Sequence, residues 1–218
     1  MDSTGTILQN GITFNPRHTM DINQLNEIPE QVDRLLKLLE DRQTNFVLVG
    51  GVAMLAYVEN RNTQDLDFII SREALDRIPE LSVEEENQNF ARAMFGNIQV
   101  DLLLTRNALF QVVMSQHVIQ QTFGQHQLWT ATPEGLILLK LYALPSLYRQ
   151  GKIQRVNLYE GDLVALALVY PISLLDCVQN LRSHLIASDI TELRGIAADL
   201  TERVDRIKQQ QNRFQSEE

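Results

Sequence analysis

Two aspartates, Asp65 and Asp67, lie one residue apart in the apolar segment DLDFII, residues 65–70. Side chains at i and i+2 of a strand share a face, so both carboxylates point the same way while Leu66 and Phe68 point into the core. Neighbouring carboxylates repel each other, and one tends to stay protonated unless a cation is present. A hard divalent ion such as Mg²⁺ accepts oxygen ligands of this kind. The pair therefore indicates a metal site, and the alternative is a solvated strand end with two ordinary aspartates.

A glycine pair precedes these aspartates in a strand, turn and helix pattern. Residues 46–49 (FVLV) form a short apolar run typical of a buried strand. Gly50 and Gly51 follow, and glycine lets the backbone turn sharply and approach a ligand closely. Residues 52–58 then predict a short helix. This context favours the functional interpretation of the aspartates.

A third acid, Asp101, stands in a second apolar strand. Residues 90–95, the turn at Gly96 and Asn97, and residues 98–104 predict a β-hairpin. A charge in an apolar strand needs a partner or a metal. Asp101 is therefore a candidate third site residue, and the alternative is an edge-strand aspartate that faces water.

The order of these features resembles the signature of the nucleotidyltransferase superfamily, which has the polymerase-β-like fold. That signature is an apolar residue and two small residues (here VGG, 49–51), a helix, and then an Asp-apolar-Asp strand (here DLD, 65–67). The gap of residues 52–64 is long for the superfamily. The run RNTQDLD at 61–67 resembles more narrowly the AbiEii-like branch, which includes toxins of toxin–antitoxin pairs.

The resemblance implies an enzyme that moves a nucleotidyl group from a nucleoside triphosphate to an acceptor. Asp65 and Asp67 would hold Mg²⁺ (or Mn²⁺) bridging the phosphates. Asp101 would help to bind a second metal ion or act as the base on the acceptor hydroxyl. Acceptors in the resembled families include RNA 3′ ends, protein hydroxyls and small molecules such as aminoglycosides.

The resemblance also implies a set of nucleotide-binding residues. Gly50 and Gly51 would bring backbone N–H groups to the triphosphate, and Thr63 would order the loop before the aspartates. Residues 132–136 (TPEGL) begin an apolar helix that contains Lys140, as in the AbiEii-like family, where such a lysine is directed toward the nucleotide. Lys140 would then offset phosphate charge, and its alternative is to extend outward to solvent.

A basic stretch follows this helix. Arg149, Lys152 and Arg155 could meet a triphosphate or an RNA backbone, or they could form a solvated basic loop. The resembled family often carries a Lys-Asp-x-x-Asp helix here, whereas residues 158–162 read LYEGD and match only Asp162. This departure keeps open an alternative from another class, a catalytically inactive binding or regulatory module that acts through a protein partner.

The domain prediction follows from these patterns. We expect an α/β (α+β) fold with a mixed sheet and flanking helices, followed by a C-terminal helical domain. The predicted divisions are an irregular arm (1–23), a nucleotidyltransferase-like domain (24–131), a helical domain (132–211) and a disordered tail (212–218). An apolar stripe in the last helix favours core packing, with a homodimer or a partner helix as the alternative.

The composition is typical of a soluble globular protein, with 44% hydrophobic and 22% charged residues. A net charge of −9 disfavours broad non-specific binding to nucleic acid. The single cysteine, Cys177, predicts a reducing compartment and a buried structural thiol. No apolar run is long enough to span a membrane, and the first residues lack the features of a secretory signal. The expected location is the cytoplasm.

Overall fold

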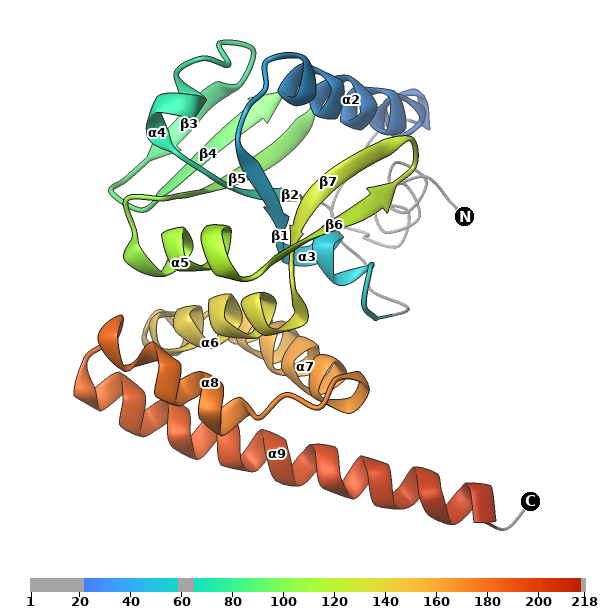
Figure 1. Cartoon of the computed structure of the whole chain (residues 1–218), viewed down its shortest axis with the longest axis vertical. Coiled ribbons are helices and arrows are strands. Elements are labelled where there is room, and N and C mark those ends of the chain that lie inside the picture. Colours follow the sequence, from blue (N-terminus) through green and yellow to red (C-terminus); the bar gives the residue numbers. More distant parts are fainter. Residues whose placement is uncertain (1–21, 59–64, 217–218) are drawn as a thin grey trace. The chain divides into compact units, whose positions relative to one another are not determined.

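The computed structural model describes residues 22–58 and 65–216, and the chain divides between Thr132 and Pro133 into two units. The first unit is a seven-stranded mixed sheet with flanking helices, in the strand order β3-β4-β5-β2-β1-β7-β6 (Figure 1). Its elements are α2 (Ile22–Asp41), β1 (Phe46–Val49), α3 (Gly50–Met54), β2 (Leu66–Ile70), α4 (Arg72–Leu75), β3 (Ser82–Glu86), β4 (Phe90–Phe95), β5 (Ile98–Leu104), α5 (Ala108–Gln116), β6 (Val118–Phe123) and β7 (His126–Ala131). This arrangement, with helices following in the second unit, confirms the predicted fold class.

The centre of the sheet is formed by β5, β2 and β1, and β2 pairs in parallel with β5 and antiparallel with β1. Leu66 and Phe68 of β2 are buried, as the alternation of the sequence predicted. On β5 the even-numbered residues are buried while Gln99, Asp101 and Leu103 are half-buried. One face of β5 therefore belongs to the core, and the opposite face carries half-buried side chains that include Asp101.

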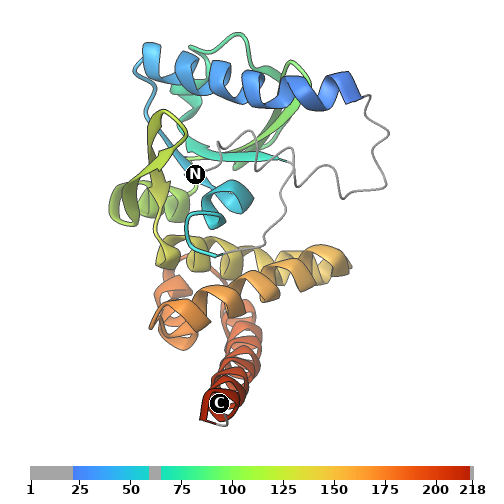
Figure 2. The ribbon, with the colours of Figure 1, turned by 90° about the vertical axis from the view of Figure 1, so that its right-hand side faces the viewer.

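Helix α2 buries an apolar stripe that includes Leu35 and Leu36. Its side chains also reach two hairpin turns, because Gln31 accepts a hydrogen bond from the N–H of Asn97 and Glu40 lies 3.2 Å from Nδ1 of His126. Strands of the sheet lie between α2 and α3 in both views (Figures 1 and 2).

Several boundaries differ from the sequence prediction. Helix α2 begins at Ile22, so the last two residues of the predicted irregular arm (1–23) are helical, while residues 1–21 lie outside the described residues. The three consecutive glutamates at 84–86 are by their charge most simply expected to form a solvated turn, but the segment Ser82–Glu86 is a strand. All of its side chains are exposed, so it carries no apolar alternation that could have identified it.

The second unit is helical. Its elements are α6 (Pro133–Arg149), α7 (Ile153–Val169), α8 (Leu174–Asn180), the 3₁₀ helix η1 (Leu181–Ser183) and α9 (Ala187–Ser216). Pro145 lies inside α6 and only residues 150–152 separate α6 from α7, so the predicted loop around the basic residues is short. Helix α9 continues through Ser216, which corrects the disorder predicted from residue 212 onward.

Apolar side chains hold the helices of this unit together. The stripe of α9 is buried within the chain, including Leu193, Ala197 and Leu200. Cys177 is buried as predicted, and burial raises the pKa of its thiol to about 12. Among the described residues, no single helix is long and apolar enough to cross a membrane. The segments Ile153–Val169 and Leu174–Ser183 have the necessary length and apolar composition only when taken together, and they are bent by 116° relative to each other.

Candidate active site at the glycine turn and the paired aspartates

The glycine turn lies directly against Asp67. Val49, the last residue of β1, is the register partner of Asp67, and the backbone N–H of Gly51 donates to Oδ2 of Asp67 at 3.3 Å. Gly50 has a φ of +65°, and a Cβ built on it would lie 1.9 Å from the same oxygen. Two separate reasons therefore favour glycine at position 50. Its backbone adopts a left-handed conformation, and the Asp67 side chain occupies the space that a Cβ would fill.

Two of the predicted acids face each other across neighbouring strands. Asp67 on β2 and Asp101 on β5 are register partners in a parallel pair, so their side chains lie on one face of the sheet. Neighbouring strands are about 4.8 Å apart. Asp65 precedes β2, and its charge is the smallest of the causes that raise the pKa of Arg92. The structure thus places Asp67 and Asp101 opposite each other, with Asp67 against Gly50.

An arginine that was not predicted engages Asp101. Nε of Arg92 donates to Oδ1 of Asp101 at 2.8 Å, and a terminal nitrogen of Arg92 donates to Oδ2 at 3.2 Å. Nε2 of Gln99 also donates to Oδ1, at 3.2 Å. The hydrogen bond to Asp101 is the largest cause that raises the pKa of Arg92, and the charges of Glu85 and Asp65 add to it. The negative charge of Asp101 is therefore balanced by the positive charge of Arg92.

The donor chemistry of the site suits Mg²⁺ or Mn²⁺ only in part. Within residues 22–58 and 65–216, no group of three or more His, Cys, Asp or Glu side chains is arranged to hold a metal ion. Asp65, Asp67 and Asp101 were expected to converge on a metal ion, and in the structure Asp101 forms a two-pronged hydrogen bond with Arg92 instead. Asp65 and Asp67 offer oxygen ligands of the right kind for one hard ion, while Asp101 is already paired with a cation.

The remaining predicted nucleotide-binding residues lie elsewhere. Thr63 is outside the described residues. Lys140 lies on α6 of the second unit, where its Nζ is 2.8 Å from Oδ2 of Asp162 and 4.5 Å from the centroid of the Tyr159 ring. Lys140 and Asp162 are both buried. Within the second unit the charge of Lys140 is thus balanced by Asp162, the one residue that matched the family's second motif.

The basic stretch after α6 is partly neutralised as well. Arg149 pairs with the buried Asp189, with a closest distance of 2.6 Å, and this hydrogen bond is the largest cause that raises the pKa of Arg149. Lys152 and Arg155 are exposed. Of these three basic residues, Arg149 is paired with a carboxylate, whereas the exposed Lys152 and Arg155 are better placed to attract an anionic ligand.

The sequence contained a signal for Arg92. Residues 90–95 and 98–104 form the predicted hairpin, and its two-residue turn pairs Phe95 with Ile98. Counting outward from that pair brings Arg92 opposite Asp101. The register of a hairpin is fixed by its turn length, so the partner of Asp101 followed from the hairpin prediction.

Comparisons with known proteins yield remote structural likenesses. No protein-family model and no curated protein sequence matches the chain. An antigenic nucleotidyltransferase-like protein from Paracoccidioides brasiliensis is similar at 13% identity and a TM-score of 0.46, over 76% of this chain and 90% of that chain. The antibiotic-resistance factor ANT(2″)-Ia is similar at 15% identity and a TM-score of 0.44, over 89% of this chain and 100% of that chain. A complex of ANT(2″)-Ia with adenylyl-2″-tobramycin is similar at 13% identity and a TM-score of 0.44, over 79% and 95% of the two chains.

Proposed function

We propose that the first unit is a metal-dependent nucleotidyltransferase that moves a nucleotidyl group from a nucleoside triphosphate to an acceptor hydroxyl. The observation that carries this proposal is the register pairing of Asp67 with Asp101 directly beside the close glycine turn at Gly50. Asp67, beside a backbone that permits close approach, is placed to bind a metal-bound triphosphate, and Asp101 on the same sheet face is placed to act on the acceptor. The resemblance of the sequence motif to the superfamily signature supports the same function.

In this proposal the acceptor oxygen forms a bond to the α-phosphorus while the bond from that phosphorus to the β-phosphate oxygen breaks. Pyrophosphate leaves with the electron pair of the broken bond. The proton of the acceptor hydroxyl passes to a carboxylate oxygen of Asp101, which acts as the base. Asp65 and Asp67 would hold the divalent ion, Mg²⁺ or Mn²⁺, which when bound would neutralise charge on the phosphates.

The other predicted residues and partners belong to the same proposal. Gly50 and Gly51 let the triphosphate approach the backbone, and Thr63 orders the loop. A phosphate contact by Lys140 would require its buried pair with Asp162 to open, which makes it the weakest member of the set. The acceptor is an RNA, a protein or a small molecule, and the net charge of −9 favours the smaller acceptors.

The assignment to the AbiEii-like branch, and with it a toxin–antitoxin role in the cytoplasm, rests on the sequence runs 61–67 and 132–136. In the same proposal the nucleotidyltransferase domain comprises residues 24–131, and the helical domain begins at 132. A homodimer or a protein partner would engage the C-terminal helices.

Thermal unfolding with nucleotides tests the proposal. A ligand present at one hundred times its Kd stabilises the folded state by about 2.7 kcal/mol, which raises the Tm by a few degrees. We expect Mg²⁺ with at least one nucleoside triphosphate to raise the Tm of the wild type, and Asp67→Asn to lose that shift. Asp76→Asn is the matched control, because Asp76 is an exposed aspartate of the same unit whose side chain pairs with Arg72.

A second candidate function has its own observation in favour. Arg92 occupies Asp101, and the Lys-Asp pair of the resembled family is missing, as expected of a catalytically inactive binding or regulatory module. This module would show no nucleotide-dependent shift in Tm for the wild type. An identical shift for the wild type and Asp67→Asn would also contradict the enzymatic proposal, because the nucleotide would then bind without the aspartate.

A further inference from the structure

A row of charged side chains crosses four strands on the face that carries the candidate site. The cross-strand pairs place these residues opposite one another in sequence across the sheet: Glu85 on β3, Arg92 on β4, Asp101 on β5 and Asp67 on β2. Residues directly opposite each other on paired strands share a face. Arg92 therefore stands in line with the carboxylates, on the side of Asp101 away from Asp67.

Two hydrogen bonds to Asp101 hold the side chain of Arg92 in this position. Its guanidinium uses both oxygens of Asp101, and Gln99 adds a third hydrogen bond to Oδ1. The side chain of Asp101 is 19% exposed, so water screens the pair only in part. A planar guanidinium that binds a carboxylate through two nitrogens fixes the orientation of both groups.

The hydrogen bonds limit what Asp101 can still do. An ionised carboxylate has about four lone-pair positions, and the Arg92 and Gln99 donors occupy three of them. The remaining position can accept a proton from an acceptor hydroxyl. This one position does not give a second divalent ion, placed between Asp67 and Asp101, coordination by both oxygens of Asp101. The positive charge of Arg92 would also repel such an ion.

We propose that Arg92 stands in for a second metal ion, so that the site binds one divalent ion per nucleotide and Asp101 acts as a base positioned by Arg92. This inference rests on the proposed nucleotidyl transfer. It specifies that Arg92, and not a second metal ion, supplies the positive charge beside Asp101. Arg92 is a positioning residue, since it acts through Asp101. Replacing Arg92 by an uncharged residue should leave Asp67 and Asp101 as two facing carboxylates, and such a pair recruits a cation.

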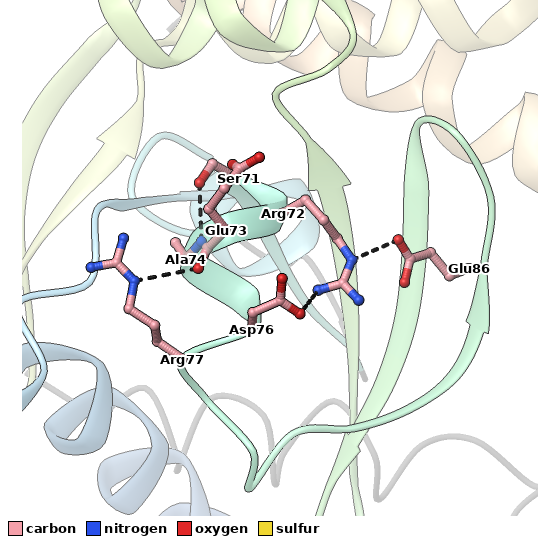
Figure 3. A network of polar contacts seen from close by, with 7 residues as sticks. All are labelled: Ser71, Arg72, Glu73, Ala74, Asp76, Arg77 and Glu86. Atoms are coloured by element: carbon pink, nitrogen blue, oxygen red, sulfur yellow. Dashed lines mark hydrogen bonds and ion pairs between the residues drawn. The ribbon is translucent and has the colours of Figure 1, made fainter.

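Arg72 provides a matched control in the same unit. Nε of Arg72 donates to Oε1 of Glu86 at 2.8 Å, and the guanidinium also pairs with Asp76 (Figure 3). The side chains of Arg72 and Arg92 are 24% and 36% exposed. Arg72→Gln thus removes a comparable ion pair whose partners are not site carboxylates.

Equilibrium dialysis counts the metal ions directly. The protein is dialysed against Mn²⁺ and an excess of a non-hydrolysable nucleoside triphosphate analogue, and the excess Mn²⁺ in the protein chamber is divided by the excess analogue. We expect a ratio of one for the wild type, Arg72→Gln and Arg92→Lys, since lysine keeps the charge. We expect a ratio of two for Arg92→Gln, with its second Mn²⁺ bound at least about tenfold more tightly than any second ion in the wild type.

The outcomes separate this inference from the function on which it rests. A wild-type ratio of two overturns the role of Arg92 while the nucleotide site stands. The same holds for an Arg92→Gln protein that binds the analogue with a ratio of one. A wild type that accumulates no analogue overturns both proposals. The wild-type ratio is decisive on its own should Arg92→Gln fail to fold, as judged by circular dichroism.

Discussion

At the scale of single residues, the site depends on the absence of a side chain at Gly50. The left-handed φ of +65° and the contact of 1.9 Å that a Cβ would make with Oδ2 of Asp67 are separate constraints. Gly151 in the second unit has nearly the same φ, +63°, but no atom lies within 4 Å of its Cβ position. The two glycines therefore separate backbone strain from steric overlap.

We predict that Gly151→Ala lowers the free energy of unfolding by about 1–2 kcal/mol, the usual cost of a left-handed alanine. Gly50→Ala should cost about 1–3 kcal/mol more, because Asp67 must move. Chemical denaturation of both variants measures the difference. Equal losses for the two would show that Asp67 moves aside without cost and that the close approach is not a constraint.

The sequence specified more of this site than its aspartates alone. The alternation in residues 65–70 predicted that Asp67 lies opposite the buried Leu66 and Phe68, and the two-residue turn contained the register that pairs Arg92 with Asp101. The parallel register between Asp67 and Asp101 had no such local signal, because β2 and β5 are separated by other elements and their alignment is set by packing. Asp101 was singled out as an acid in an apolar strand, whereas its two hydrogen bonds with Arg92 came from the structure.

At the scale of elements, a buried ion pair links two helices of the second unit. Lys140 on α6 and Asp162 on α7 are both buried and 2.8 Å apart. Removing one member of such a pair leaves an uncompensated charge in the interior, whereas replacing both with apolar residues is often close to neutral. The pair therefore stabilises the contact between α6 and α7 only as long as both members are present.

We predict that Lys140→Met lowers the free energy of unfolding by about 3–5 kcal/mol and that adding Asp162→Leu restores most of the loss. Lys152→Met, at an exposed lysine of the same unit, should change it by less than about 0.5 kcal/mol. Urea denaturation of the full chain measures all three variants. If Lys140→Met costs no more than Lys152→Met, the pair is not a stabilising contact between the helices.

The elements missed by sequence reasoning share a physical cause. Strand β3 is fully exposed and β6 is largely so, and both lie at the ends of the strand order, so neither carries the apolar alternation of a half-buried strand. The start of α6 was different, because Thr132, Pro133 and Glu134 are residue types that favour the first positions of a helix. The sequence thus predicted elements that are determined by adjacent residues. It did not predict strands whose formation depends on pairing with another strand.

At the scale of the whole molecule, the last helix has a buried part and an exposed part. Val204 is buried and Lys208 donates to the carbonyl oxygen of Ala167, whereas the side chains of residues 209–215 are exposed. The final turns of α9 therefore contribute little to the core of the second unit.

We predict that deleting residues 209–218 changes the free energy of unfolding by less than about 0.5 kcal/mol. Deleting residues 204–218 should cost at least about 1.5 kcal/mol, because it removes the buried Val204 side chain and the hydrogen bond of Lys208. Thermal and urea unfolding of the two truncated chains measure the contrast. If deleting residues 209–218 lowers the free energy of unfolding by much more than about 0.5 kcal/mol, the exposed end of α9 packs against another surface, such as a second copy of the chain.

The two ends of the strand order also differ in charge, and this bears on how the sheet meets other chains. The outer strand β3 carries three consecutive glutamates, Glu84 to Glu86, whereas β6 at the other end (VIQQTF, residues 118–123) has no charged residue. An incoming strand must approach backbone groups along such an edge, and clustered like charges repel it. Among the described strands, we therefore expect β6 rather than β3 to accept an added strand, in aggregation or in recognition of an extended peptide.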